Sequence, residues 1–410
     1  MAKKKEREEL KRQGYVSTFT LTGTALVNEN TFSLDQMSNK SNWIYNRMNL
    51  GVSCGDQNGT VYASAMGGYG ADRENVIYVH GRMPDGSDDF TNRYTVNFDD
   101  RNDPNVIKEV GQQCYFVAGL EKDNKDKTVY RNFLSAYDFI QYVNDHLENG
   151  TPITVRGNIE YRFYNGGVVT QCNITNLALS NMEPKDYKAR FVQTMLIDSD
   201  CFGKPDKETG EADVVGYALE YAKEYNGHDI TDKDGRGTMV PMPYTYKYKV
   251  NMENPDLAKK AIKKLFGVKK GSVNQITMEG DFVSGGAVVT LTADDLPDDV
   301  KELVALGIMS QSEAIAACAT NGNRERKMVL TRPRIRNVQD KDGVSTPEVQ
   351  IMEDVYSEED LDYFRSMTPP EFEAVDEDLP FEDKKDEPEE VDFESVTDGE
   401  DMSWLDSLGE

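Results

Sequence analysis

Aromatic and basic side chains alternate along several short segments of this sequence. Trp43, Tyr45 and Arg47 are spaced two apart, so they share one face if the segment is a β-strand. Such rings stack on unpaired nucleobases, at about 1–3 kcal/mol per base, while arginine and lysine hold the phosphates. The pattern therefore predicts a surface for single-stranded nucleic acid. The candidate contacts are Trp43, Tyr45, Arg47, Tyr62, Tyr69, Arg156, Tyr161, Phe163, Lys247, Lys249, Arg332, Arg334 and Arg336.

Two basic segments in the second half of the chain extend this set. Lys247 and Lys249 share one strand face, opposite a face of alternating tyrosines. Arg332, Arg334 and Arg336 are also spaced two apart, and Pro333 between them predicts an edge strand. Three aligned arginines repel one another, and a bound phosphate would relieve that repulsion. The alternative interpretation is a solvated edge with no ligand.

Two similar segments indicate that one structural plan occurs twice. Ile153–Ile159 and Ile276–Phe282 both read Ile-Thr-x-x-Gly-(Asn/Asp)-apolar. A helical pattern with apolar residues three and four apart precedes each of them, over Tyr137–Leu147 and Leu257–Phe266. Strand-like runs surround both, and the one over Val214–Tyr225 is equally compatible with a helix. The first unit contains Ser17–Val27, Trp43–Ser53, Thr60–Ala65 and Val168–Leu179, and the second contains Arg190–Ile197, Val214–Tyr225, Tyr244–Val250 and Met328–Val338.

Three strands, a helix and two strands are the element order of the five-stranded OB barrel. The sequence thus predicts a mainly β protein with some α: tandem OB-fold-like five-stranded barrels with helical insertions, followed by a disordered acidic tail. The expected parts are a charged N-terminal arm at 1–14, a first OB-like domain at 15–182, a second at 188–338 and the tail at 339–410. The segments Glu74–Arg131 and Val289–Asn323 interrupt the two units, and the first of them has no assigned structure.

Charge is distributed unevenly along the 410 residues, whose formal net charge is −27. The part from Val338 to Glu410 holds 27 of the 73 acidic residues and 4 of the 46 basic ones, so the rest is nearly neutral. A segment this acidic buries too little apolar surface to offset chain entropy, so we expect disorder. Short apolar groups within it predict a site that partner proteins bind, and the alternative interpretation is a tail that only aids solubility. They are Leu379, Pro380, Phe381, Trp404, Leu405 and Leu408.

Several function classes lack any motif in the sequence. There is no phosphate-binding loop, no HExxH, and no metal-ligand spacing among the three histidines and five cysteines. We therefore expect no catalytic residues, no cofactor and no metal. No run of 18 apolar residues predicts a membrane helix. The odd number of cysteines and the absence of CxxC pairs favour a reducing cytoplasm.

The chain resembles the single-stranded DNA-binding proteins of bacteriophages. The segments Trp43–Val52 and Ile153–Ile159 and the acidic tail carry this resemblance. Asp376–Phe381 is similar to the acidic tip of bacterial single-stranded DNA-binding proteins, but it lies 29 residues before the C-terminus. The resemblance implies a protein that coats and protects single-stranded DNA in replication or recombination, in the host cytoplasm. It also implies that the tail recruits replication or recombination proteins.

Two other interpretations remain open at this stage. A phage structural or scaffold protein with a protein-binding tail would bury the rings of Trp43–Ser53 and Gly157–Tyr164 in its core. An OB protein that binds RNA would use the same rings, because contacts to the 2′-hydroxyl leave no trace in the sequence. The sequence does not indicate the oligomeric state.

Overall fold

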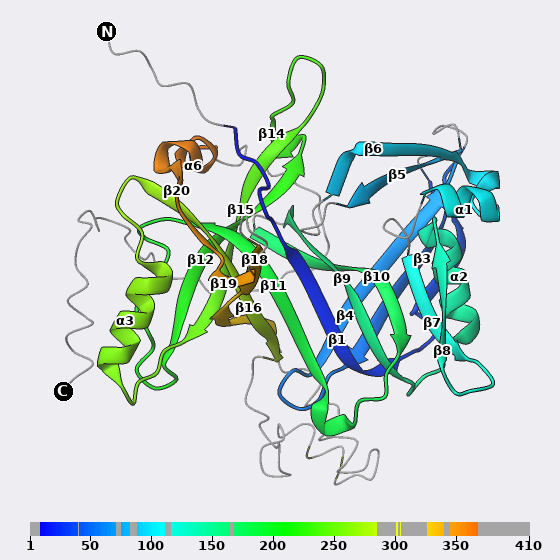
Figure 1. The fold of residues 1–410 in the computed structure, drawn as a ribbon, viewed down its shortest axis with the longest axis horizontal. Helices are drawn as coiled ribbons and strands as arrows, with labels where there is room; N and C mark the ends of the chain where they lie inside the picture. The colour runs from blue at the N-terminus through cyan, green and yellow to red at the C-terminus, as the bar shows by residue number, and fades with distance from the viewer. Residues whose placement is uncertain are drawn as a thin grey trace.

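Two five-stranded barrels lie next to each other in the computed structural model, which is mainly β with a few helices (Figure 1). The structure describes residues 9–39, 41–70, 75–82, 88–110, 116–164, 167–284, 326–339 and 345–367, together with residues 301 and 304. The first barrel consists of β1 (Ser17–Leu26), β3 (Ile44–Ser53), β4 (Thr60–Tyr69), α2 (Ala136–His146), β9 (Pro152–Tyr164) and β10 (Gly167–Leu179). The edge strand β2 (Phe32–Met37) pairs with β3.

Strand pairing closes this set into a ring. Strand β1 is antiparallel to both β3 and β9, β3 pairs with β4, and β10 pairs with β9. The ring closes where β10 runs parallel to β4, at Asn173 and Ser64. This is the connectivity of an OB barrel, in which the helix stands between the third and fourth strands.

The second barrel repeats these pairings with β11 (Lys188–Ile197), β12 (Glu211–Ala222), β15 (Thr238–Lys249), α3 (Pro255–Phe266), β16 (Ser272–Ser284) and β17 (Arg326–Pro333). Strand β11 pairs with β12 and β16, β12 pairs with β15, and β17 runs antiparallel to β16 and parallel to β15. The predicted class and order of elements are therefore confirmed. The segment over Val214–Tyr225 is a strand, continued by the short hairpin of β13 (Glu224–Tyr225) and β14 (His228–Asp229).

The glycine of the repeated motif has the same packing role in both barrels. A Cβ at Gly157 would lie 2.9 Å from the ring of Phe19, and one at Gly280 would lie 2.3 Å from the ring of Phe191. Each phenylalanine is the register partner of its glycine on the neighbouring strand. The motif needs glycine at this position because a ring packs directly on the backbone and leaves no room for a side chain.

The first strands of the two barrels form the joint between them. Strands β1 and β11 pair antiparallel, with Phe19 opposite Phe191. Because equivalent residues face each other, the barrels are related by an approximate two-fold axis. Helices α2 and α3 accordingly stand at opposite ends of the molecule (Figure 1).

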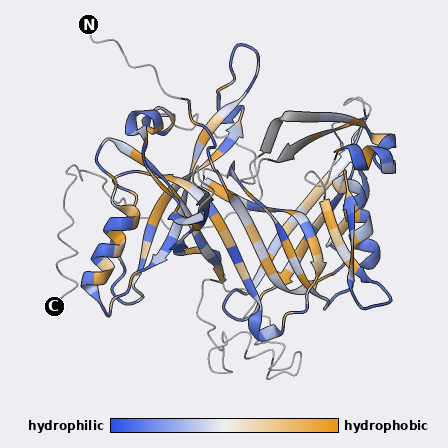
Figure 2. Cartoon of the chain, viewed as in Figure 1, coloured by the Kyte–Doolittle hydropathy of each residue, from blue (hydrophilic) through white to orange (hydrophobic). Residues whose placement is uncertain are grey.

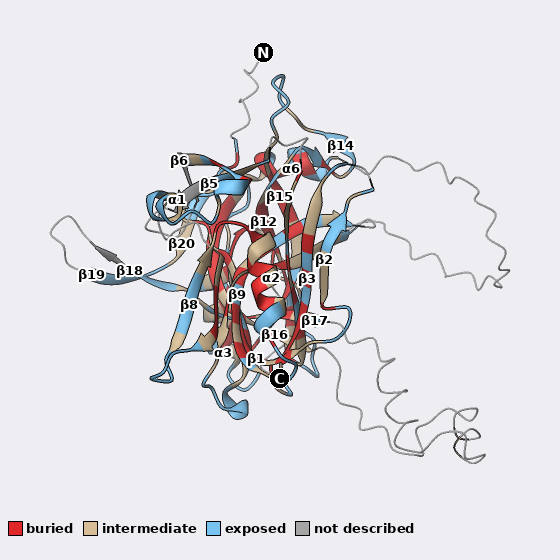
Figure 3. Ribbon diagram, turned by 90° about the vertical axis from the view of Figure 1, so that its right-hand side faces the viewer, coloured by how far each residue is buried: buried red, intermediate tan, exposed pale blue. Residues whose placement is uncertain are grey.

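Alternation along the strands separates core from surface (Figures 2 and 3). In β3, Asn46, Met48 and Leu50 are fully buried, while Arg47 and Asn49 are exposed. Asn46 is polar but satisfied, because its side chain donates to the Tyr137 carbonyl at 3.0 Å and accepts the backbone N–H of Asp35 at 2.8 Å. The face that carries Arg47 thus points outward, and the face of Asn46, Met48 and Leu50 points into the core.

The first insertion is built from regular elements that the sequence did not predict. It contains β5 (Val76–Arg82), β6 (Asp88–Asn97), the 3-10 turn η2 (Phe98–Asp100), α1 (Pro104–Val110), β7 (Phe116–Lys122) and β8 (Thr128–Phe133). Strand β7 runs parallel to β10 and so widens the sheet of the first barrel. A second 3-10 turn, η4 (Pro184–Asp186), leads into β11. The segment Val289–Asn323 lies outside the described residues, apart from 301 and 304.

The predicted disorder from residue 339 onward is wrong for residues 345–367. They form β19 (Ser345–Val349), β20 (Ile351–Ser357) and α6 (Glu358–Arg365), with β18 (Ile335–Gln339) pairing β19 and β20 pairing β16. Leu361 and Phe364 are 0% and 1% exposed, and Arg365 forms an ion pair with the buried Asp198. The prediction of disorder used the acidic composition of the whole segment and overlooked these two apolar residues, which lie three apart on one helix face.

The N-terminal arm is docked rather than solvated where the structure describes it. Leu10 is 3% exposed and belongs to the main hydrophobic core. Arg12 donates to the carbonyl of Leu219 at 2.6 and 2.9 Å and pairs with Glu220 at 2.6 Å. These contacts correct the prediction of a free arm for residues 9–14.

Candidate nucleic-acid interface

The outer face of β3 and β4 in the first barrel gathers several of the predicted contacts. The register places Tyr45 opposite Gly68 and Arg47 opposite Met66. Trp43, just before β3, stacks on Tyr45 with ring centroids 4.7 Å apart and planes 18° apart. Both rings are half-buried. A Cβ at Gly68 would lie 2.0 Å from the Ile44 carbonyl oxygen and 2.7 Å from the Tyr45 Cβ, so this position has no room for a side chain.

Tyr62 extends the same face along β4 and is 52% exposed. Its ring lies over Gly51 of β3, where a Cβ would come within 3.1 Å. Met66, two positions from Ser64 and four from Tyr62, is 56% exposed on the same side. Met66 was not among the predicted contacts, although its spacing from Tyr62 would have identified it. Together, Trp43, Tyr45, Arg47, Tyr62 and Met66 define what we call the aromatic face.

Arg47 is the cation of the aromatic face. Its side chain is exposed and forms no ion pair with any residue that the structure describes. Its neighbours on this face, Asn49 and Ser64, are uncharged. A guanidinium without a carboxylate beside it remains available for an anion.

Of the other predicted rings, Tyr161 is buried in the interior, whereas Phe163 and Tyr69 are partly buried against neighbouring rings. Tyr161 is 2% exposed, and its hydroxyl lies 2.8 Å from that of Tyr246. Burial raises the pKa of the Tyr161 hydroxyl well above its ordinary value. Phe163 packs edge-on against Tyr225 at 4.9 Å, and Tyr69 stacks on Phe98 at 4.3 Å. Tyr161 is therefore wrong as a surface contact, because its face of β9 points into the core.

The three arginines predicted to share one strand face lie in different elements. Arg332 ends β17 and pairs with Glu279 at 2.7 Å, whereas Arg336 belongs to the separate β18–β19 ribbon. Between them, the backbone N–H of Arg334 donates to the carbonyl of Thr277 at 2.8 Å. Strand β17 ends at Pro333, so the three arginines do not share one strand. Strand β17 is also not an edge, since it lies between β15 and β16.

The other predicted cations lie on outward faces as expected. Arg156 is exposed on β9 and sits opposite Thr20 of β1. Lys247 and Lys249 point outward from β15, while Tyr246, the residue before Lys247, is fully buried. Lys247 forms an ion pair with Asp213 of β12. The predicted tail contacts Leu379, Pro380, Phe381, Trp404, Leu405 and Leu408 lie outside the described residues.

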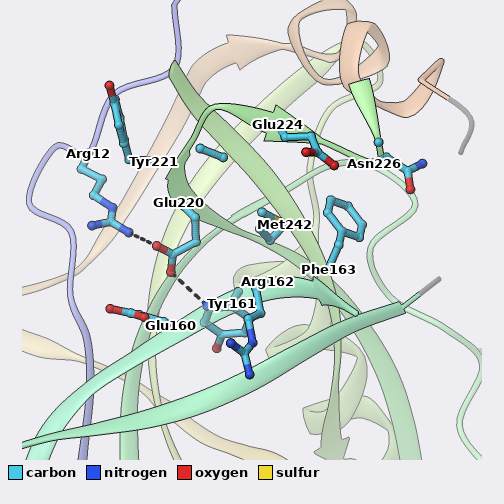
Figure 4. A pocket seen from close by; sticks show the side chains of 12 residues that line it. Arg12, Glu160, Tyr161, Arg162, Phe163, Glu220, Tyr221, Glu224, Asn226 and Met242 are labelled. Carbon is cyan, nitrogen blue, oxygen red and sulfur yellow. Dashed lines mark hydrogen bonds and ion pairs between the residues drawn. The ribbon is translucent and has the colours of Figure 1, made fainter. Parts of the chain in front are cut away.

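A cavity of about 570 Å³ opens between the barrels, where β9 passes β12 (Figure 4). Glu220 lies at its edge, pairing with Arg12 and accepting the backbone N–H of Tyr161 at 3.2 Å. Burial raises the pKa of the Glu220 carboxyl above its ordinary value. Glu160 and Glu224 also line the cavity, so its carboxylates outnumber its arginines. This balance is unsuited to a phosphate.

Neither a metal site nor a membrane helix is found in the described ranges. They contain no group of three or more histidine, cysteine, aspartate or glutamate side chains placed to hold a metal. None of their helices is long and apolar enough to cross a membrane. The cysteines Cys54, Cys172 and Cys201 are buried and free.

Comparison with known proteins gives one family match and weak structural likenesses. Residues 93–279 match the profile of the family YorF. No curated protein matches the chain. The single-stranded DNA binding protein from Thermus aquaticus is 11% identical at a TM-score of 0.30, covering 80% of this chain and 97% of its own. A deletion mutant of that protein is 12% identical at a TM-score of 0.27, covering 66% of this chain and 87% of its own. Similarity at this level is too low to assign a function.

Proposed function

We propose that the protein binds single-stranded DNA on the aromatic face of its first barrel. The observation that carries this proposal is the group formed by half-buried Trp43 and Tyr45 and exposed Tyr62 and Met66. It surrounds Arg47 on the second and third strands of an OB barrel. That face is where OB folds bind oligonucleotides. A structural protein would gain nothing from leaving such rings open to water.

The chemistry of the face favours a single strand over a duplex. Rings that lie flat against a sheet offer stacking partners only to bases that are themselves unstacked. Reading a duplex groove would instead require a projecting helix or ribbon with polar side chains at its tip. The same face would also accept RNA, so the sugar preference is an outcome of the test below.

We also propose a wider role, which is supported by the uneven distribution of charge between the nearly neutral body and the acidic C-terminal segment. The chain would coat and protect single-stranded DNA during phage replication or recombination in the cytoplasm, without a catalytic step. Its acidic C-terminal segment would recruit partner proteins through its apolar groups. What supports this part is the concentration of carboxylates and short apolar groups after residue 367.

The test is fluorescence anisotropy with labelled dT of about 30 nucleotides, on the order of two OB site sizes. We expect salt-sensitive binding that unlabelled duplex does not compete. Tyr62→Ala and Trp43→Ala are each expected to weaken binding about 5- to 100-fold, the loss of one stacked base. Tyr130→Ala is the matched control, because Tyr130 is 62% exposed on β8, away from the aromatic face.

Three outcomes would contradict the proposal in different ways. Absence of binding by the full chain at low salt would remove the DNA function. Equal losses for Tyr62→Ala and Tyr130→Ala would remove the aromatic face as the site. Strong competition by RNA of equal length would favour an RNA-binding function.

A further inference from the structure

A cationic hollow lies along β15 and β17 of the second barrel and is also lined by Val168 of β10 in the first. Lys247 of β15 and Lys327 of β17 line it together with Arg326, in a volume of about 330 Å³. The two lysine side chains are 30% and 29% exposed, so they are partly desolvated. Partial burial strengthens the attraction of such cations for an anion.

Two carboxylates of the same barrel neutralise these lysines. Asp213 of β12 is the register partner of Lys247 and forms an ion pair with it. Glu211, two positions earlier on β12, pairs with Lys327 at 3.0 Å. Both acids therefore stand on the outward face of the strand that borders the hollow.

The first-barrel positions equivalent to the Lys247–Asp213 pair are uncharged. Strand pairing makes Ser64 the counterpart of Lys247, because each lies opposite the parallel fifth strand, at Asn173 and Val329 respectively. By the same register, Asn49 is the counterpart of Asp213. The Lys247–Asp213 ion pair is thus not a requirement of the barrel, and a structural role common to both barrels does not explain it.

The hollow adjoins the aromatic face across the joint. Arg326 donates to the backbone carbonyl of Thr60 at 2.6 Å, and Thr60 is two residues from Tyr62 on the same strand. Asn58, in the turn before β4, donates to the carbonyl of Phe282 at 2.7 Å. A strand that leaves the first barrel past Tyr62 would meet these cations next.

We propose that this hollow is a phosphate subsite of the single-stranded DNA path, and that Asp213 and Glu211 occupy its lysines when no strand is bound. This inference rests on the proposed function. A carboxylate and a phosphodiester oxygen are both anionic acceptors for an ammonium group. The bound strand must therefore displace the two acids, and their charges oppose its binding.

The test compares neutral variants of the two acids with a matched control. Asp213→Asn and Glu211→Gln are each expected to tighten binding of labelled dT about fivefold at low salt, because a charge that opposes the phosphate is gone. Glu183→Gln is the control, since Glu183 pairs with Lys185 at 2.7 Å on the exposed turn η4 and makes the same change in net charge.

The lysines give the second half of the test. Lys247→Ala and Lys327→Ala are expected to weaken binding and to lower the slope of log K against log salt by about 0.7 each. In the double variant Asp213→Asn/Lys247→Ala, the gain from Asp213→Asn should disappear. Thermal melting of every variant checks folding, because an exposed ion pair is worth at most about 1 kcal/mol.

Each outcome decides between the two proposals. If Asp213→Asn tightens binding no more than Glu183→Gln, net charge explains the gain and the subsite is wrong. If neither acid variant changes the affinity for dT while Tyr62→Ala weakens it, the DNA function is supported and the phosphate subsite is wrong. If the unmodified chain does not bind single strands, both fall.

Discussion

At the scale of single residues, the main surprise is a buried polar network between the barrels. The hydroxyl of Tyr161 donates to the Gln193 amide oxygen at 3.0 Å and lies 2.8 Å from the hydroxyl of Tyr246. Gln193 in turn donates to the hydroxyl of Tyr15 at 3.1 Å. Each of these groups has a partner, so the network joins β9, β11, β15 and the segment just before β1 without an unsatisfied hydroxyl.

This network predicts that Tyr161→Phe lowers stability and leaves DNA binding unchanged. Removing the hydroxyl deprives buried Tyr246 and Gln193 of a partner, which costs about 1–3 kcal/mol. Urea unfolding measures the free energy of unfolding, and anisotropy with dT measures binding. Tyr62→Phe is the control, because the Tyr62 ring is exposed and should lose neither. Weaker binding by Tyr161→Phe at full stability would return Tyr161 to the list of DNA contacts.

At the scale of elements, regular alternation and helix periodicity located most barrel strands and both barrel helices. What they left open was which face of a strand points inward. In β9, Tyr161 and Phe163 share one face and Arg162 and Tyr164 the other, and only closure of the ring decides between them. Closure depends on pairings more than a hundred residues apart, such as β1 with β9. The arrangement of the predicted contacts was therefore less predictable than the elements carrying them.

Helix α6 illustrates the opposite error, in which composition outweighed spacing. Its sequence holds four acids in eight residues, which reads as part of a disordered tail. Yet Phe364 packs on Tyr225 with centroids 5.2 Å apart, and the side chains of Ser357 and Asp360 form a capping box. Two buried side chains and a cap are enough when a barrel supplies the partner surface.

We therefore predict that Phe364→Ala releases α6 from the second barrel. Truncating a fully buried phenylalanine costs about 3–5 kcal/mol, which exceeds what the remaining contacts of a two-turn helix supply. Hydrogen exchange of Glu358–Arg365 should become fast, while exchange in the strands of the first barrel stays slow. Glu359→Ala is the control, since Glu359 is exposed on the same helix. Unchanged protection of α6 in Phe364→Ala would mean that Leu361 and the contacts of Arg365 are enough to hold the helix.

At the scale of the whole molecule, the acidic part of the chain begins before the last described elements of the fold end. The acidic composition begins near Val338, but ordered structure continues through β20 and α6 to Met367. The segment from 368 to 410 still holds 18 acidic and 2 basic residues. A truncation meant to remove the acidic segment must therefore end at Met367, because a cut at Val338 would also remove a strand of the sheet and its covering helix.

Ending the chain at Met367 should raise its affinity for dT, most strongly at low salt. The removed carboxylates repel phosphates and compete with them for Arg47 and the lysines of the second barrel. That competition has a range of about 30 Å at 0.01 M salt and about 8 Å at 0.15 M, so the gain should shrink steadily between the two. Anisotropy of both chains across this range measures it, with circular dichroism to verify that the shortened chain keeps its strands. Equal affinities at 0.01 M salt would show that the acidic segment does not act on the DNA site and leave partner binding as its role.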